Sequence, residues 1–217
     1  MSNPPEGPRR ILFHVPIVHT AEDLGSMAEE TRNRLSKALG AEAVARRTAT
    51  IVAFWGALRD RICALPLAWD RTRLYQDGLP VGGHELAIVK ELAEKGNQNH
   101  ALLLSLVERG AALMGTEDPT LLLREYRRIQ RLVQLTAVGA HDALELRNEG
   151  DALLRERDEF IANRIDSTLR EGESGILFVG LLHRVDELLR GKVELHSFKD
   201  SLPPGAEPWR QARRSQS

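Results

Sequence analysis

The sequence predicts an α/β fold with a mixed or mostly parallel central sheet of about five strands flanked by long helices. Two observations carry this prediction. Short apolar runs alternate along the chain with longer stretches whose apolar residues recur three and four positions apart. The most apolar of the short runs, 175–183, also has the composition of a strand that is buried on both faces, which is typical of a parallel sheet.

Five segments have the character of strands. They are 11–19, 71–76, 111–115, 175–183 and 192–198. Pro16 has no backbone N–H, so the first strand is expected to lie at an edge, to contain a bulge or to end there. The last strand alternates polar and apolar residues, which predicts a half-exposed edge strand.

The segments between these strands have helical periodicity. The predicted helices begin at Thr20 and run toward Gly40, and then occupy 42–65, 84–95, 99–108, 121–133, 141–171 and 185–189. Thr20 and Asp23 match a capping box, and Pro66 ends the second helix. Residues 116–119, which include two acids and a proline, are typical of the start of a helix.

Length and composition limit the classes of protein. A chain of 217 residues favours one domain, placed at 10–200, with a disordered lead-in at 1–9 and a disordered tail at 201–217. The 30 basic and 31 acidic residues nearly cancel, which argues against a nucleic-acid partner. Cys63 is the single cysteine, so an internal disulfide is excluded and a cytoplasmic location is expected. No secretion signal or membrane span is predicted.

Polar residues end three of the predicted strands. His19 and His183 each follow an apolar strand and precede a helix, and Glu117 with Asp118 closes the strand at 111–115. If these strands are neighbours, the two imidazoles and Glu117 form one site for a metal or for acid–base catalysis. The alternative is that each histidine caps a helix or bonds a backbone carbonyl, and that the acids only favour a helix N-terminus.

A glycine-rich loop at 78–83 is a second candidate for ligand binding. Tyr75, Asp77 and Glu85 flank it, and its glycines allow close approach of a cofactor or ligand, although no phosphate-binding pattern is present. A simple turn is the alternative. Arg157 and Arg155 precede the apolar stripe of the long helix and can reach a carboxylate or phosphate, or else form surface ion pairs.

The pairing of Ile17-Val-His19-Thr with Gly180-Leu-Leu-His183, together with Arg157 in the helix before the second motif, resembles the TraB/Tiki/ChaN/erythromycin-esterase superfamily. That superfamily has an α/β fold with a GxxH motif near each end and an acid between them. Its characterised members include metal-dependent proteases, esterases and haem-binding proteins. The second motif matches in full, whereas Pro16 stands where the first motif has glycine.

The resemblance implies a ligand or catalytic role for His19 and His183, an acid role for Glu117 or Glu85, and a substrate-facing role for Arg157. We therefore expect a hydrolase of ester or peptide bonds, with or without a divalent metal, whose pocket lies at the carboxyl ends of the strands. The alternative is a non-catalytic module of the same fold that binds a small ligand or haem, or a subunit of a larger complex. A divalent metal is favoured over haem, and a homo-oligomer is compatible with the sequence.

Overall fold

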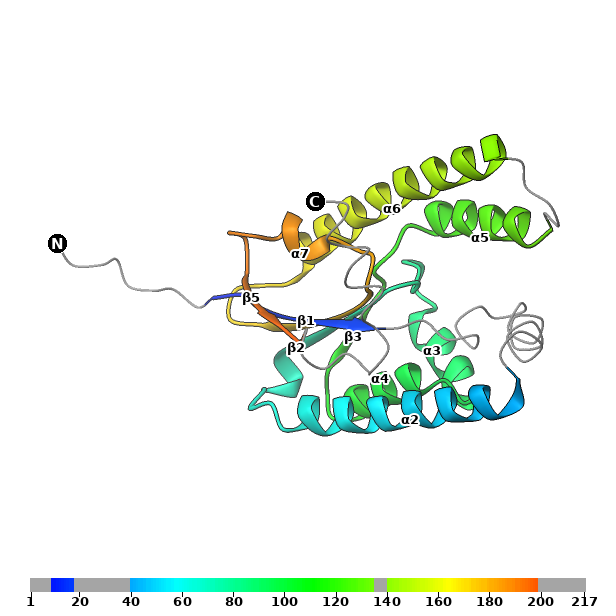
Figure 1. The fold of residues 1–217 in the computed structure, drawn as a ribbon. Helices are drawn as coiled ribbons and strands as arrows, with labels where there is room; N and C mark the ends of the chain where they lie inside the picture. The colour runs from blue at the N-terminus through cyan, green and yellow to red at the C-terminus, as the bar shows by residue number, and fades with distance from the viewer. Residues whose placement is uncertain (1–8, 18–39, 135–139, 199–217) are drawn as a thin grey trace.

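The computed structural model describes residues 9–17, 40–134 and 140–198. A five-stranded sheet lies at its centre, with helices on both faces (Figure 1). The predicted helix between Thr20 and Gly40, His19, residues 1–8 of the predicted disordered lead-in and the whole predicted tail at 201–217 lie outside the described residues. No helix among the described residues has the length and apolarity that crossing a membrane requires.

All paired strands of the sheet run parallel, in the order β3-β2-β4-β1-β5. The strands are β1 (Ile11–Ile17), β2 (Thr72–Gln76), β3 (Ala112–Met114), β4 (Ser174–Gly180) and β5 (Glu194–Ser197). The central strand β4 pairs with β1 and with β2, and all but its first residue are buried. This confirms the predicted α/β fold and explains why the β4 segment is apolar without alternation.

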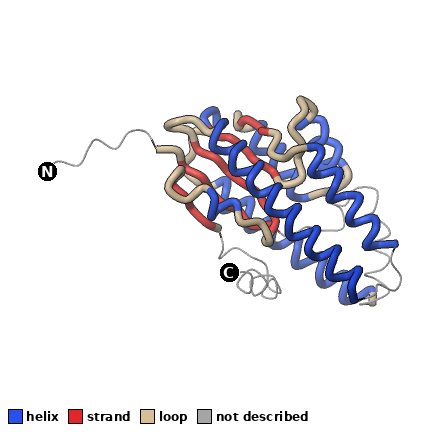
Figure 2. Tube along the Cα trace, turned by 90° about the horizontal axis from the view of Figure 1, so that it is seen from above, coloured by secondary structure: helices blue, strands red, loops and turns tan. Residues whose placement is uncertain are grey.

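Helices cover the two faces of the sheet in separate groups. One face carries α2 (Ala41–Cys63), α3 (Glu85–Glu94) and α4 (Gln98–Glu108), and a short 3-10 turn, η2 (Trp69–Arg71), precedes β2. The other face carries α6 (Ala140–Thr168) and α7 (Val185–Leu188), with α5 (Pro119–Gln134) packed against α6. Seen from above, the long helices of this second group extend well past the strands (Figure 2).

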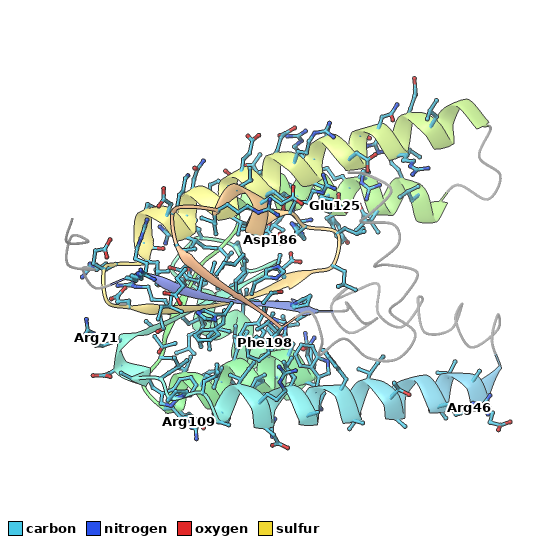
Figure 3. All side chains as sticks on the ribbon, turned by 60° about the vertical axis from the view of Figure 1, so that its left-hand side comes forward. Arg46, Arg71, Arg109, Glu125, Asp186 and Phe198 are labelled. Atoms are coloured by element: carbon cyan, nitrogen blue, oxygen red, sulfur yellow. The ribbon has the colours of Figure 1, made fainter. Side chains whose placement is uncertain are left out.

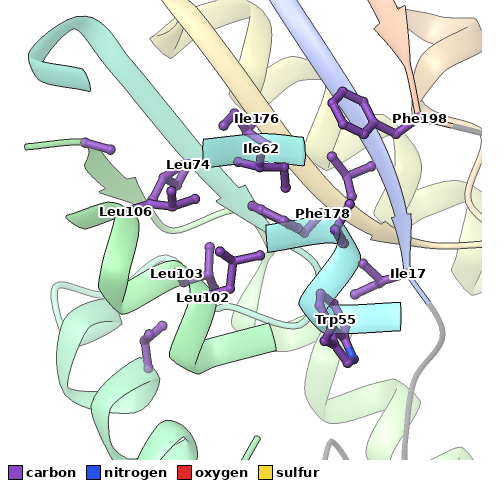
Figure 4. Close-up of a cluster of buried hydrophobic side chains, with 14 of the residues drawn as sticks. Ile17, Trp55, Ile62, Leu74, Leu102, Leu103, Leu106, Ile176, Phe178 and Phe198 are labelled. Atoms are coloured by element: carbon purple, nitrogen blue, oxygen red, sulfur yellow. The ribbon is translucent and has the colours of Figure 1, made fainter. Parts of the chain in front are cut away.

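Each face of the sheet has its own apolar core. On the α2 and α4 face, Leu74, Ile176 and Phe178 of the sheet contact Ile62 and Leu103 of the helices (Figure 4). On the α6 face, a smaller cluster joins the sheet to residues of α6 and α7. Its buried members are Leu12, Tyr75, Ile161, Ala162, Ile165, Leu169, Leu177, Val179, Val185 and Leu189. Burial of each large apolar side chain contributes about 1.5–3 kcal/mol, so both faces stabilise the sheet.

Phe198, the last residue that the structure describes, packs against the apolar core on the α2 and α4 face. Phe198 is 7 % exposed and lies between β5 and α2 (Figure 3), where the guanidinium of Arg61 is 4.8 Å from its ring centroid. Its ring also meets Phe13 edge to face, at 6.2 Å between centroids. These contacts attach the edge strand β5 to the layer of helices beneath it.

Two ion pairs lie at the amino-terminal edge of the sheet. Arg10 Nη1 lies 2.9 Å from Asp166 Oδ1, and Arg10 Nη2 donates to the carbonyl of Lys192. Arg73 binds Glu173 through two nitrogens. The four side chains are 16–35 % exposed, so solvent screens both pairs. These pairs fasten the beginnings of β1 and β2 to the segments that enclose them.

Pro16 does not mark an edge strand, because β1 is an interior strand, but it does lie at the strand end, one residue before Ile17. It pairs with β4 along its whole length and with β5 from Ile11 to His14. The carbonyls of Arg10 and His14 both accept bonds from the β5 side, at Glu194 and Phe198. By alternation along the strand, the missing N–H of Pro16 faces this same side, where the next bond of the ladder would go to the carbonyl of Phe198, so the pairing of β1 with β5 stops at this point.

A correction to the sequence predictions concerns His183. The strand β4 ends at Gly180, three residues before the predicted end, and His183 lies in the turn that follows. Its backbone N–H donates to the carbonyl of Gly180 at 3.1 Å, which closes the turn before α7. His183 is therefore placed by a tight turn beside the strand end and not by the strand itself.

Candidate functional site

The carboxyl-terminal edge of the sheet contains a point where chain connections diverge. From β2 the chain passes to α3 on one face, whereas from its neighbour β4 it passes to α7 on the other face (Figure 1). Open α/β sheets bind their ligands at such a point, where neighbouring connections leave the sheet on opposite faces. The end of β1 lies on the other side of β4, with Ile17 opposite Gly180.

Asp77 and Glu117 are fixed at this edge by backbone hydrogen bonds. The N–H of Asp77 donates to the carbonyl of Phe178 at 2.9 Å and so continues the pairing of β2 with β4. The turn after Asp77 needs the positive φ of Gly78, +77°, and the Gly78 N–H donates to Glu117 Oε1 at 2.8 Å. Glu117 itself is paired through its backbone with Leu79 and Val81.

Arg157 of α6 joins the two carboxylates. Its Nε and Nη2 atoms donate to the two oxygens of Glu117 at 2.7 and 2.6 Å, and Nη2 also donates to Asp77 Oδ1 at 2.8 Å. The Arg157 side chain is 10 % exposed, and those of Asp77 and Glu117 are 2 % and 1 % exposed. Burial lowers the pKa of Arg157, but the hydrogen bond to Glu117 and the charge of Asp77 outweigh it and raise the pKa.

His183 is held between Asp77 and a third carboxylate, that of Asp158. Its Nδ1 lies 2.5 Å from Asp158 Oδ1, and its Nε2 lies 3.4 Å from Asp77 Oδ2. The second oxygen of Asp158 accepts the N–H of Arg184 at 2.9 Å. Because an ionised Asp158 can only accept, the proton of a neutral ring is assigned to Nδ1, and Nε2 faces Asp77 with its lone pair.

The charges of this cluster are unequal. Asp77 and Glu117 bind the guanidinium of Arg157, and Asp158 binds the ring of His183, so three carboxylates meet one guanidinium and one imidazole. Burial lowers the pKa of His183, but the charge of Asp77 and the hydrogen bond to Asp158 prevail and raise that pKa to about 9. Burial also raises the pKa of Glu117. The cluster therefore favours the uptake of positive charge.

Three of these residues have the donor atoms of a metal site. One ligand atom each from Asp77, Glu117 and His183 lie within 4.8 Å of one another. Carboxylate oxygen and imidazole nitrogen suit divalent transition metals. The bond from His183 Nδ1 to Asp158 is the outer contact that metal-binding histidines usually make, since it fixes the ring and its tautomer. The donor set thus fits a divalent cation.

Some of the site residues that the sequence predicts lie together at this edge, and others do not. Glu117, Arg157, His183 and Asp77 are in contact through the bonds above, whereas His19 lies outside the described residues. Tyr75 points to the α6 core, where its hydroxyl lies 2.9 Å from Thr168 Oγ1. Arg155 is exposed, unlike its neighbour Arg157.

Glu85 closes the glycine-rich loop without joining this cluster. Its Oε1 accepts the N–H groups of Gly82 and Gly83 at 3.0 and 3.1 Å. The hydrogen bond from Gly82 is the main cause that lowers the pKa of Glu85. A side chain at Gly115 would come within 2.5 Å of that same oxygen and 2.7 Å of Val81 Cα, so the loop lies directly against Gly115.

Asp158 is a site residue that the sequence analysis did not single out. Residue spacing in the long helix indicates that Arg157, the neighbour of Asp158, is buried. Leu153, Arg157, Ile161 and Ile165 recur every four residues, and all four are buried. A charged residue in phase with an apolar stripe must be buried and therefore paired. Asp158 is 4 % exposed and is itself in phase with buried positions, because Ala162, Ile165 and Leu169 follow it at helical spacing, so the same argument reaches it.

Comparisons with protein-family models, with curated proteins and with solved structures found no match. The geometry of the described residues is therefore the basis of the functional argument.

Proposed function

We propose that the chain is a hydrolase of ester or amide bonds, with its active site at Asp77, Glu117, Arg157 and His183 and with a divalent cation as cofactor. The observation that carries this proposal is the convergence of three buried ligand atoms within 4.8 Å. They come from the ends of β2, β3 and β4. An excess of buried negative charge is costly, and its presence at a topological switch point supports a functional origin.

The chain's own residues have distinct tasks in this proposal. Asp158 orients the ring of His183, and Arg157 holds Glu117 and Asp77 side by side while offsetting one of their charges. A divalent cation, when bound, polarises a carbonyl and lowers the pKa of water. Hydrolysis adds water across the scissile C–O or C–N bond, and a proton must reach the leaving group. His183, which would hold the cation through Nε2, keeps its remaining proton on Nδ1 for Asp158, so the proton that the attacking water loses is the one that reaches the leaving group.

The geometry favours a cation over haem. An axial haem ligand needs an accessible Nε2, whereas His183 is 4 % exposed and its Nε2 faces Asp77 at 3.4 Å. A small cation requires only the approach of donor atoms that already lie together. The non-catalytic alternative from the sequence analysis then becomes a measurable outcome, namely cation binding without turnover.

Elemental analysis and turnover test the proposal together. The purified full chain is assayed for bound transition metals, and then against a panel of activated esters and peptide anilides. His183→Ala is compared with His196→Ala, which removes a histidine that is 48 % exposed on β5. We expect metal and turnover to be lost in the first variant and kept in the second. His19→Ala tests the remaining prediction from the first motif. Equal metal content and equal turnover in the two variants would refute the proposal.

A further inference from the structure

A cavity of about 400 Å³ lies between α5 and α6, outside the candidate site. Its lining consists of long polar side chains, those of Arg124, Arg127, Gln130, Arg131 and Glu149. Glu149 stands eight positions before Arg157 on α6, so the cavity lies about 12 Å along that helix from the buried carboxylates. The side chains of Arg131 and Glu149 are 54 % and 41 % exposed, so a small molecule can reach the cavity from solvent.

Three arginines of α5 lie on the side of the helix that lines this cavity. Arg124, Arg127 and Arg131 recur at three- and four-residue spacing, which places them on one face of a helix. The chain as a whole has a formal charge of −1, so a generally basic composition does not account for this group. The lining therefore has a local positive character, with one carboxylate among three guanidinium groups.

Bonds to α6 hold two of these guanidinium groups in place. Two nitrogens of Arg124 donate to Glu156, and Nη2 of Arg131 donates to both oxygens of Glu149 at 2.6 Å. Within the described part of the chain, Nε of Arg124 and both Nε and Nη1 of Arg131 keep N–H groups without a partner. The ion pairs offset part of the positive charge. They also fix the arginine side chains, so less conformational entropy is lost when a ligand binds.

Arg127 has no carboxylate of its own. It forms no hydrogen bond or ion pair with any residue that the structure describes. The acid closest to it in sequence, Glu125, binds Arg128 at 2.8 Å, and Asp151 also acts on the charge of Arg128. Arg128 lies against Gly150 and is not part of the lining. The cavity thus has one unpaired guanidinium between two anchored ones along the helix.

We propose that this cavity binds a phosphate monoester of a small hydroxylated molecule, that is, a sugar phosphate. A phosphate monoester has three terminal oxygens and a charge of about −1.5 to −2 at neutral pH, so several guanidinium groups can donate to it at once. A carboxylate has only two oxygens, and a single arginine already matches both. The inference does not depend on the proposed hydrolysis.

The rest of the lining suits the hydroxylated part of such a ligand. The carboxylate of Glu149 and the amide oxygen of Gln130 both accept hydrogen bonds from hydroxyl groups. The cavity is larger than a bare phosphate ion requires, and its volume falls in the range of roughly 300–1,000 Å³ that is usual for small-molecule sites. Phosphate and sugar therefore each have matching groups in the lining.

Calorimetric titration of the metal-free full chain tests this site. The probes are glucose 6-phosphate, inorganic phosphate, glucose and glucuronate. We expect glucose 6-phosphate to bind at least about tenfold more tightly than each of the others, because it alone offers both groups. Arg127→Gln should weaken its binding about 10- to 100-fold. Arg59→Gln, which removes an exposed arginine of α2 on the other face of the sheet, should leave the affinity unchanged (Figure 1).

Three results would overturn the sugar-phosphate site: no detectable binding of glucose 6-phosphate, binding of inorganic phosphate or glucuronate that is equally tight, or equal affinities of the two variants. If Arg127→Gln fails to fold, the ranking of the four probes on the wild-type chain still decides. Because no metal is present, a cation at Asp77, Glu117 and His183 cannot supply the binding. Failure of this site and failure of the proposed hydrolase are therefore separate results.

Discussion

The two edges of the sheet use the same residue types in different ways. At the amino edge, Asp166 lies near both Arg10 and Lys192, Arg10 also lies 4.0 Å from Glu171, and Arg73 pairs with Glu173. Three bases thus meet three acids, with side chains that are 16–69 % exposed. At the carboxyl edge, Arg157 faces more carboxylates than it can balance, and the side chains are at most 10 % exposed. Matched and half-exposed pairs fit a structural role, whereas unmatched and buried charge is the signature of a functional site.

Removal of Arg157 should have the largest effect on stability. Arg157→Leu leaves Glu117 and Asp77 buried without a counter-charge, and we expect a loss of about 3–5 kcal/mol in the free energy of unfolding. Denaturant unfolding at neutral pH measures it, with Arg73→Leu at the amino edge as the matched control. Equal losses in the two variants would remove the distinction between the edges.

His183 should make the stability of the metal-free protein depend on pH. Its pKa is raised from 6.5 to about 9 in the folded state, so the stabilisation is complete below pH 6.5 and disappears as the pH rises through 9. The shift corresponds to about 3 kcal/mol. The pH profile of unfolding should lose this slope in His183→Gln and keep it in His196→Gln. A slope that survives in His183→Gln would contradict the assignment.

Asp158 should affect cation binding more than folding. Asp158→Asn keeps the shape but weakens the bond that orients His183, and outer contacts of this kind alter metal affinity by about 10- to 100-fold. Calorimetric titration with Mn²⁺ and Zn²⁺ measures the change. The exposed neighbour Glu159→Gln serves as the control, and equal affinities of the two variants would show that Asp158 has no such role.

The smallest effect is expected at the amino edge. Glu173→Gln removes one charge from a partly exposed pair with Arg73, and we expect a loss of about 1 kcal/mol with no change in cation affinity. Thermal unfolding and the same calorimetric titration check both parts. A loss of cation binding in Glu173→Gln would mean that the two edges are coupled.

The fold could be predicted from local sequence patterns, whereas the candidate site could be predicted only in part. The apolar run of β4 and the spacing within α4 and α6 predict these elements because burial on one or both faces selects the residues directly. The bond from Arg157 to Glu117 joins residues that are 40 positions apart, and its partner choice depends on the strand order.

Pro16 and His183 show how local rules mislead near strand ends. The rule that proline avoids interior strands assumes that both neighbours extend as far as the proline, and β5 ends earlier. The apolar run that reaches His183 includes two leucines of a turn, Leu181 and Leu182, which are less buried than the strand before them, so apolar composition alone did not mark the end of the strand. In both cases the end of the strand depends on where the neighbouring segments pair with it, and the sequence of one segment cannot specify that.

The most direct test of the central claim is a crystal of the full chain grown with Mn²⁺ or Zn²⁺ and measured at the absorption edge of the metal. We predict an anomalous peak in coordination contact with Asp77, Glu117 and His183, with Asp158 still bonded to Nδ1 of His183. No peak at this cluster in a crystal that contains the metal elsewhere, or a peak only at the amino-edge pairs, would contradict the account.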